Sequence, residues 1–229
     1  MNAPIDLERA RFNMIEQQIR PWDVLDLEVL GLLSQLRRED FVALAHKALA
    51  FVDMQIPLLG KADEAEKNGW CMLEPKVEAR ILQDLKVRPH EKVLEVGAGS
   101  GYMAALLASR AQRVISLELH PELARMAREN LQRAGLTNAE VRVADGSRGL
   151  AAEGPFDVIV LSGSVAEVPP AILSQLKTGG RLAAITGSEP VMRATFITRT
   201  GQTTYTTAQP WDTNAPRLAN FHEPSRFNF

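Results

Sequence analysis

The sequence has little sulfur chemistry and no excess of charge of either sign. It contains one cysteine, Cys71, and four histidines in 229 residues. A single thiol excludes an internal disulfide, and so few soft ligands argue against a structural zinc site, so we expect no metal. The 26 basic and 28 acidic side chains give a net charge of −2. Such a balance offers no basic field for a phosphate backbone, so we expect no nucleic-acid partner.

Long hydrophobic runs and low-complexity tracts are also missing. No stretch approaches the run of about 18 apolar residues that a membrane span needs, and residues 1–20 carry acidic and basic side chains in place of an apolar signal region. We therefore predict no membrane partner and a cytoplasmic location. With 45% hydrophobic residues, the chain is long enough to bury a core as one compact unit. The sequence is compatible with a monomer or a dimer.

From residue 90 onward, short β-branched runs alternate with longer segments of helical period. This alternation is typical of an α/β fold with a doubly wound, mostly parallel sheet that helices cover on both faces, and we predict seven strands in a Rossmann-like arrangement. Two last runs, Thr195 to Arg199 and Thr203 to Thr207, predict an antiparallel C-terminal hairpin. The predicted parallel strands are 93–96, 114–119, 141–143, 156–161 and 182–185, and the predicted helices are 101–111, 121–134 and 169–176.

The first third of the chain has a different pattern. Leucine and phenylalanine recur at helical spacing between Leu25 and Phe51, and Asp23 followed by Asp26 is predicted to form an N-cap pair for the second helix. We predict an N-terminal helical cap over residues 1–78, which ends in a loop beside the site, and a ligand-binding domain over residues 79–229. The charged stretch 61–67 is predicted to be a solvated loop, with a mobile lid as the alternative.

The most informative segment, residues 93–102, reads V-L-E-V-G-A-G-S-G-Y. A strand that ends in glycines at positions 97, 99 and 101 turns sharply into a helix and lets a ligand approach main-chain N–H groups. A dinucleotide fingerprint requires a further glycine where Tyr102 stands, which argues against an NAD-dependent oxidoreductase. Glu95 would repel a pyrophosphate and suits a cationic ligand. S-adenosylmethionine, with its sulfonium and ammonium groups, is such a ligand.

Two carboxylates follow the next two predicted strands, where open α/β sheets bind their ligands. Glu118 stands about 20 residues beyond Gly99, a spacing at which a carboxylate accepts hydrogen bonds from the ribose hydroxyls. Asp145 precedes Gly146 after the third strand, where a carboxylate can accept from an adenine amino group. The alternatives are a solvated carboxylate beside a helix start for Glu118 and a simple Asp-Gly turn for Asp145. Taken in order, the three elements predict a nucleoside-containing cofactor.

On these residues the chain resembles the class I S-adenosylmethionine-dependent methyltransferases, and within them the protein-L-isoaspartate O-methyltransferase family. Residues 11–19 are similar to that family's first helix, 38–41 to its arginine-to-phenylalanine turn, 50–57 to the segment before its acceptor loop, and 175–181 to the approach to its fifth strand. The resemblance implies methyl transfer from S-adenosyl-L-methionine to L-isoaspartyl carboxylates in damaged proteins or peptides, with S-adenosyl-L-homocysteine as product. The motifs and the resemblance together predict cofactor contacts at Glu95, Gly97, Ala98, Gly99, Gly101, Tyr102, Glu118, Leu119, Asp145 and Gly146.

The chain departs from this family's pattern at the acceptor loop. The family has Ile-Ser-Gln-Pro there, and this sequence has Met-Leu-Glu-Pro at residues 72–75. Leu73 cannot donate a hydrogen bond to an incoming carboxylate, and an ionised Glu74 facing the pocket would repel one, although Glu74 is equally well placed to cap the helix that begins at Pro75. Methyl transfer to a carboxylate depends on positioning and needs no general base. We therefore assign no certain catalytic residue and name Leu73 and Glu74 as acceptor-loop candidates. The predicted substrate contacts are Trp70, Cys71, Met72 and Ser162.

Four functions stay open at this point. The first is methylation of isoaspartyl carboxylates, a protein-repair activity, and the second is a methyltransferase of the same fold with a different protein or small-molecule acceptor, which Leu73 and Glu74 favour. The third is an S-adenosylmethionine-binding protein without catalysis. The fourth is an NAD-dependent oxidoreductase, against which Tyr102 counts. The histidines are predicted to be non-catalytic; they are His46, His90, His120 and His222.

Overall fold

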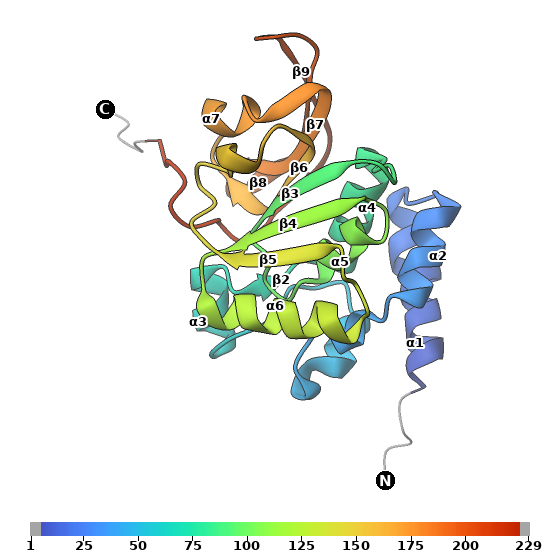
Figure 1. Ribbon diagram of the computed structural model, residues 1–229. Coiled ribbons are helices and arrows are strands. Elements are labelled where there is room, and N and C mark those ends of the chain that lie inside the picture. Colours follow the sequence, from blue (N-terminus) through green and yellow to red (C-terminus); the bar gives the residue numbers. More distant parts are fainter. Residues whose placement is uncertain (1–5, 225–229) are drawn as a thin grey trace.

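The computed structural model describes residues 6–224, and within them the main sheet has seven strands in the order β5-β4-β3-β6-β7-β8-β9. Neighbouring strands from β5 to β7 are parallel, whereas β8 and β9 run antiparallel to their neighbours. Figure 1 shows β5 at one edge of this sheet. The predicted doubly wound, mostly parallel sheet with an antiparallel C-terminal hairpin is confirmed. The strands are β3 (Lys92–Val96), β4 (Arg113–Glu118), β5 (Ala139–Val143), β6 (Phe156–Val165), β7 (Leu176–Ser188), β8 (Val191–Arg199) and β9 (Tyr205–Thr213).

Successive side chains of the central strands point to opposite faces of the sheet, and each face has its own core. Val93 and Val158 belong to the larger cluster, whereas their neighbours Leu94 and Ile159 belong to the smaller one. This alternation follows from the period of two along a strand. The larger core is covered by α4 (Pro75–Leu85), α5 (Tyr102–Ala108), α6 (Pro121–Arg133) and the N-terminal segments, and the smaller one includes Ile172 of α7 (Pro170–Leu173).

The predicted helices are present, with shorter bounds. Proline begins α4, α6 and α7, as its fixed φ favours at a first helical position. The last of these helices ends at Leu173 because the chain turns into β7 at Leu176. Among residues 6–224, no helix combines the length and the apolar character needed to cross a membrane.

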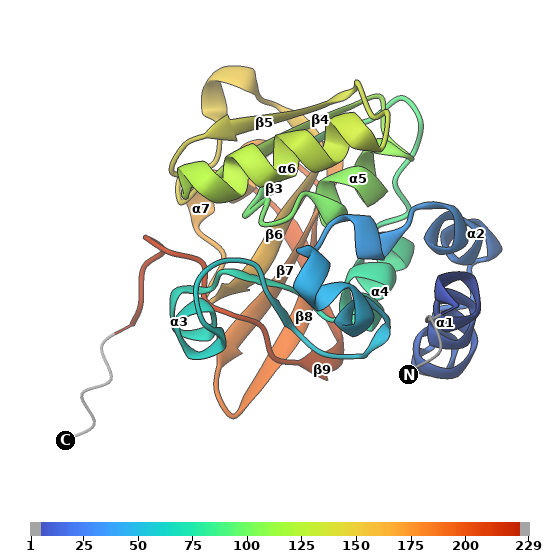
Figure 2. The same ribbon diagram turned by 90° about the horizontal axis from the view of Figure 1, so that it is seen from below.

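The N-terminal segment is helical, as predicted. It contains the α-helices α1 (Leu7–Met14) and α2 (Leu27–Gln35) and the π-helix η1 (Ile15–Ile19). Three 3-10 helices also belong to it, namely η2 (Arg20–Trp22), η3 (Arg38–Asp40) and η4 (Leu44–Phe51). Asp26 caps α2, because its carboxylate accepts hydrogen bonds from the N–H groups of Glu28 at 2.8 Å and Val29 at 3.3 Å. Figures 1 and 2 both place α1 and α2 beside α4 and at the opposite end of the molecule from α3.

The prediction of a solvated loop at residues 61–67 is wrong, because α3 (Ala62–Asn68) occupies this stretch. Its alanines, glutamates and lysine are good helix formers, and its charges suit the helix dipole, with Asp63 near the start and Lys67 near the end. Gly69 ends the helix at φ +72°, and its N–H bonds back to the last turn. The helix leads into β2 (Cys71–Met72), which pairs with β1 (Ile56–Pro57).

A buried ion pair joins the N-terminal segment to α4, and a hydrogen bond from the same arginine reaches the loop before that helix. The guanidinium of Arg38 is fully buried and bonds both the carboxylate of Glu78 and the carbonyl oxygen of Leu73. Burial raises the pKa of Glu78 to about 7 even though the charge of Arg38 opposes this shift. The loop that carries Leu73 is therefore fixed by a hydrogen bond from the buried guanidinium of Arg38.

Candidate functional site

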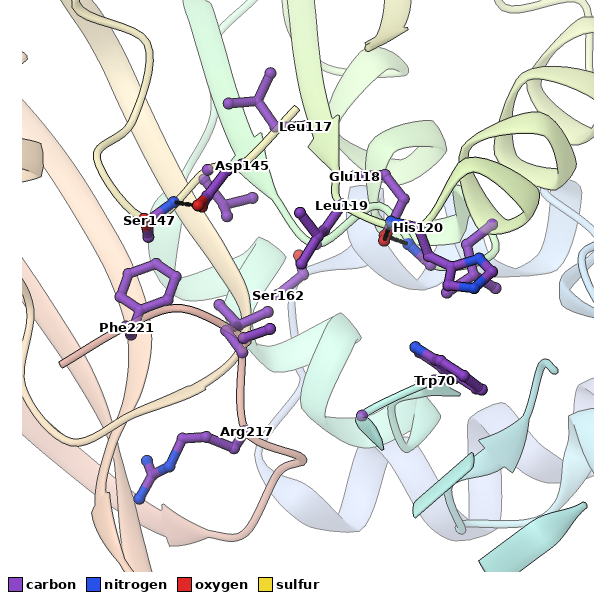
Figure 3. A pocket seen from close by; sticks show the side chains of 18 of the residues that line it. Trp70, Leu117, Glu118, Leu119, His120, Asp145, Ser147, Ser162, Arg217 and Phe221 are labelled. Atoms are coloured by element: carbon purple, nitrogen blue, oxygen red, sulfur yellow. Dashed lines mark hydrogen bonds between the residues drawn. The ribbon is translucent and has the colours of Figure 1, made fainter. Parts of the chain in front are cut away.

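A cavity of about 300 Å³ lies at the carboxyl ends of the parallel strands. The strand order reverses between β3 and β6, and open α/β sheets bind ligands in the crevice that such a reversal leaves. Figure 3 shows the side chains around it, which come from the ends of β4 and β6, the loop after β5, the segment before β2 and the C-terminal segment. The predicted site residues in its wall are Gly97, Gly99, Glu118, Leu119, Asp145, Gly146, Trp70, Cys71 and Ser162.

The glycines after β3 accommodate different neighbours. Gly97 has φ +92°, and a Cβ there would lie 2.8 Å from a methyl carbon of Leu218. Gly101 has φ +83° and packs on α6, since a Cβ would lie 3.0 Å from the Cα of Ala127. Gly97 therefore leaves room for the side chain of Leu218, whereas Gly101 lets α5 approach α6 and lies outside the cavity lining.

Glu118 is held in place by the backbone on both sides of it. One carboxylate oxygen accepts from the N–H of Gly99 at 2.8 Å, and the other accepts from the N–H of His120 at 2.9 Å. The residue is 7% exposed and lies in the cavity wall, and each carboxylate oxygen keeps a further lone pair. Glu118 thus links the glycine turn to the end of β4 and still has acceptor capacity for a ligand.

Asp145 is oriented by two donors. It accepts from the N–H of Ser147 at 2.9 Å and from Nδ2 of Asn220 at 3.0 Å. Partial burial acts to raise the pKa of Asp145, but these hydrogen bonds outweigh it and hold the pKa below its usual value. The next residue is glycine because a Cβ on Gly146 would lie 2.4 Å from Cγ1 of Val96.

The structure places Glu95 behind the cavity wall, which differs from the predicted direct contact. Its side chain is fully buried and accepts from the hydroxyls of Ser116 at 2.5 Å and Ser162 at 2.7 Å. Burial raises the pKa of Glu95 to about 7, against the effect of these two hydrogen bonds. A ligand in the cavity therefore meets Ser162, and Glu95 acts on it only through that hydroxyl.

A second, smaller cavity of about 20 Å³ adjoins the first. The two cavities share Cys71, Gly97, Gly99 and Ser162, so they meet at these residues. Leu73 lines the smaller cavity, but it is only 5% exposed and packs in the core. Three more predicted residues lie in this second wall, namely Met72, Ala98 and Tyr102.

Glu74 stands at the N-cap position of α4, yet its side chain makes no capping hydrogen bond. One carboxylate oxygen accepts from Nε2 of Gln55 at 3.3 Å, and the other is buried with no partner among the described residues. The capping alternative is therefore wrong in this structure, and Glu74 lies outside the lining of both cavities. Burial, together with the charges of Glu66 and Glu74, raises the pKa of Cys71 to about 11, so the thiol stays protonated at neutral pH.

Trp70 and His120 form one side of the larger cavity. Their rings pack edge to face at 4.9 Å between centroids, and Figure 3 shows them next to each other. His120 is the N-cap residue of α6. Its position in the cavity wall was missed, because the spacing that identifies Glu118 says nothing of a residue two positions later.

The sequence analysis also missed the C-terminal strap, residues 214–221. This segment lies along β6, where the N–H of Ser164 donates to the carbonyl of Pro216 and the N–H of Leu218 donates to that of Ser164. Leu218 packs between two glycines, since a Cβ on either Gly97 or Gly163 would lie 2.8 Å from its side chain. The sequence gives little signal for such a strap, which appears as a polar tail with isolated apolar residues. Its contributions to the cavity are Arg217, Leu218, Ala219 and Phe221.

A doubly wound sheet with a glycine turn after its first parallel strand, and with acidic residues after the next two strands, defines the class I S-adenosylmethionine-dependent methyltransferases. Residues 9–209 match the family model "Protein-L-isoaspartate(D-aspartate) O-methyltransferase (PCMT)". The chain belongs to this family. The match ends before the C-terminal strap.

Curated relatives agree with the family match. The chain is 39% identical over 193 residues to the protein-L-isoaspartate O-methyltransferase of Koribacter versatilis, covering 84% of this chain and 82% of the relative. It is 40% identical over 179 residues to the protein of the same name from Methanoculleus marisnigri, covering 78% of each.

Solved structures show the same fold. A protein-L-isoaspartate O-methyltransferase structure superposes with a TM-score of 0.76 at 21% identity, covering 92% of this chain and 66% of that one. A putative enzyme of the same name from Plasmodium falciparum, in complex with S-adenosyl-L-homocysteine, superposes with a TM-score of 0.69 at 18% identity, covering 90% of this chain and 98% of that one.

Proposed function

We propose that this chain transfers a methyl group from S-adenosyl-L-methionine to the carboxylate of L-isoaspartyl residues in proteins or peptides. The observation that carries the proposal is the cavity at the strand reversal, in which the glycine turn and Glu118 are joined by a hydrogen bond from the N–H of Gly99. A cavity of about 300 Å³ is within the range of small-molecule sites. Family membership supports the choice of acceptor.

The residues present fit the cofactor. Glu118, fixed by two backbone N–H groups, accepts from the ribose hydroxyls, and Asp145, fixed by Ser147 and Asn220, accepts from the adenine amino group. The glycine turn, against which Leu218 packs at Gly97, lets the amino-acid part of the cofactor approach the backbone at Gly99. When bound, S-adenosylmethionine supplies a methyl group that is already activated by its sulfonium.

The chain's own contribution to the transfer is positioning. A carboxylate acceptor is already ionised at neutral pH, so no residue has to remove a proton from it. Cys71 fits this requirement, because a thiol with a pKa of about 11 stays neutral beside the acceptor. The acceptor approaches where the two cavities meet, with Trp70, Cys71, Met72 and Ser162 as its contacts. In this proposal, residues 1–78 form the cap that carries the acceptor loop and residues 79–229 hold the cofactor.

A second candidate function keeps the cofactor and changes the acceptor to another protein site or a small molecule. It is favoured by Leu73, which stands in the smaller cavity's wall without a polar side-chain atom. In this case the cofactor contacts are the same, and only the group that receives the methyl differs.

The test is the transfer of labelled methyl from S-adenosylmethionine to a short isoaspartyl peptide, beside the same peptide with an ordinary aspartyl residue. We expect label on the isoaspartyl peptide alone, and we expect mild base to release it, as a methyl ester requires. Label on neither peptide, with the cofactor bound, would refute the isoaspartyl assignment and favour a different acceptor or a binding protein without catalysis.

A further inference from the structure

Ser162 occupies the place where the two cavities meet. Ser162 lies on β6 two residues after Val160, so its side chain is on the same face of the sheet as those of Val158 and Val160, which pack in the larger core. Of the four residues that the cavities share, two are glycines, and the third, Cys71, carries a weakly donating thiol. The hydroxyl at this junction is therefore that of Ser162, and Figure 3 shows its side chain in the middle of the larger cavity's lining.

Other hydroxyls near the acceptor loop are less well placed. Ser100 and Tyr102 line the smaller cavity but not the larger one, where the methyl donor would lie. The Ser100 hydroxyl oxygen accepts from the N–H of Tyr102 at 3.4 Å. Leu73 of the acceptor loop lines the same small cavity, and its side chain has no polar atom. The acceptor loop therefore offers no side-chain hydroxyl to this cavity at residue 73, whereas Ser162 does.

We propose that Ser162 supplies the hydroxyl that holds the acceptor carboxylate, since Leu73 in the wall of the same small cavity supplies none, and that Glu95 is the positioning residue that directs this hydroxyl. This inference rests on the proposed function, because it concerns how the same site binds an isoaspartyl carboxylate.

The contacts of Glu95 explain how it directs Ser162. Glu95 on β3 lies opposite Ser116 on β4 and Val160 on β6, so both serines reach it from neighbouring strands on one face of the sheet. When Glu95 is ionised it can only accept, and both serine hydroxyls turn toward it. When it carries a proton, it can donate to Oγ of Ser162. The serine hydroxyl is then free to donate to a carboxylate in the cavity.

Both protonation states of Glu95 are accessible near neutral pH. The groups that face it are Ser116 of β4 and Ser162 of β6 through hydrogen bonds, and Glu78 of α4 and Glu118 of β4 through their charges. Burial is the largest influence, and the two carboxylates act in the same direction, so its pKa is raised to about 7. The donor form of Ser162 is accordingly favoured below pH 7 and lost above it.

The first experiment compares labelled-methyl transfer to the isoaspartyl peptide by the wild type, Ser162→Ala, and the double variant Leu73→Ser with Ser162→Ala. Loss of a hydrogen bond to a charged group corresponds to about a 10- to 150-fold loss of kcat/KM for the peptide. We expect this loss in Ser162→Ala, little loss in Ser162→Thr, and recovery in the double variant, because Leu73→Ser puts a hydroxyl into the wall of the same small cavity. Ser109→Ala, which removes a hydroxyl at the end of α5, is the matched control.

Binding of S-adenosylhomocysteine, measured by calorimetry, shows that each variant is folded. A Ser162→Ala variant that binds this ligand and transfers methyl as fast as the wild type would refute the role of Ser162, and so would a double variant that stays as slow as Ser162→Ala. Absence of transfer by the wild type itself would refute the proposed function, and this inference with it. Transfer by the wild type that Ser162→Ala leaves unchanged would refute this inference alone.

The pH profile tests Glu95 separately. In the wild type, kcat/KM for the isoaspartyl peptide is expected to fall by about five- to tenfold between pH 6 and pH 8, as Glu95 loses its proton. Glu95→Gln keeps a donor at all pH values, so its profile is expected to fall clearly less than that of the wild type; Glu78, whose pKa is also raised to about 7 and which lines the smaller cavity, titrates in both proteins. A Glu95→Gln profile that falls as steeply as that of the wild type would overturn the positioning role, because a merely structural carboxylate would not set the pH dependence.

Discussion

Replacing Glu118 by alanine tests the cofactor site at its best-defined point. The carboxylate accepts two backbone hydrogen bonds, from Gly99 at 2.8 Å and from His120 at 2.9 Å, and is 7% exposed. Alanine removes both bonds and the acceptors proposed for the ribose hydroxyls. Two effects are therefore expected: weaker cofactor binding, and a less stable glycine turn in the free protein.

The size of the binding effect follows from the groups left without partners. In the complex, the ribose hydroxyls of the ligand would lose their proposed acceptor. Leaving such buried donors unpaired costs about 1 to 3 kcal/mol, which corresponds to about a 5- to 150-fold rise in the Kd of S-adenosylhomocysteine. The Glu118→Gln variant is expected to bind S-adenosylhomocysteine nearly as weakly as the Glu118→Ala variant. Both carboxylate oxygens accept from N–H groups, so the amide nitrogen of glutamine would meet one of these donors with a donor of its own.

Isothermal titration calorimetry with S-adenosylhomocysteine measures the change. Glu122→Ala is the matched control, because it removes the same charge from the exposed first turn of α6 without touching the cavity. A Kd for Glu118→Ala within about twofold of the wild type would refute the ribose assignment. A loss of affinity in Glu122→Ala equal to that in Glu118→Ala would attribute the effect to net charge.

Three further predictions follow from the strap and the buried charges. Leu218→Ala removes the side chain between Gly97 and Gly163 and should raise the Kd of S-adenosylhomocysteine by about tenfold in calorimetry; an unchanged Kd would contradict a role for the strap. Arg38→Met leaves Glu78 buried without its ion-pair partner, and it should lower the free energy of unfolding by about 3 kcal/mol at pH 8. The decrease should be smaller at pH 5, where Glu78 can hold a proton; urea titration at the two pH values measures both. Burial raises the pKa of Glu95 in the folded protein to about 7 from 4.5. The free energy of unfolding is therefore expected to fall by on the order of 3 kcal/mol as the pH rises from below 4.5 to 7, because the folded state holds this proton more tightly than the unfolded state. Glu95→Gln should remove this part of the pH dependence.

Local patterns predicted the parts of the site that depend on strand order and spacing. β-Branched runs identified the strands, and the spacing from the glycine turn identified Glu118, which the structure places in the cavity wall. The burial of Glu95 was not predictable in the same way. Alternation along β3 gives the face on which its side chain lies, whereas its depth depends on Ser116 and Ser162, which belong to other strands.

The strap and α3 show what local patterns leave out. Leu218 fits against Gly97 and Gly163, which are far away in the sequence, so no periodicity within residues 214–221 reveals this contact. The helix α3 is short and highly charged, and it ends in a backbone conformation that Gly69 allows. Composition alone favoured a loop there, because a strongly polar stretch of seven residues shows no apolar face.

In the proposed function, methyl passes from cofactor held in the cavity at the strand reversal to an isoaspartyl carboxylate. A single-turnover chase tests it most directly: the protein is mixed with an equimolar amount of methyl-labelled S-adenosylmethionine and then given isoaspartyl peptide together with excess unlabelled cofactor. We expect the bound label to appear on the isoaspartyl peptide as a base-labile ester, and we expect none on the matching aspartyl peptide. Release of the label as intact S-adenosylmethionine with both peptides would contradict it.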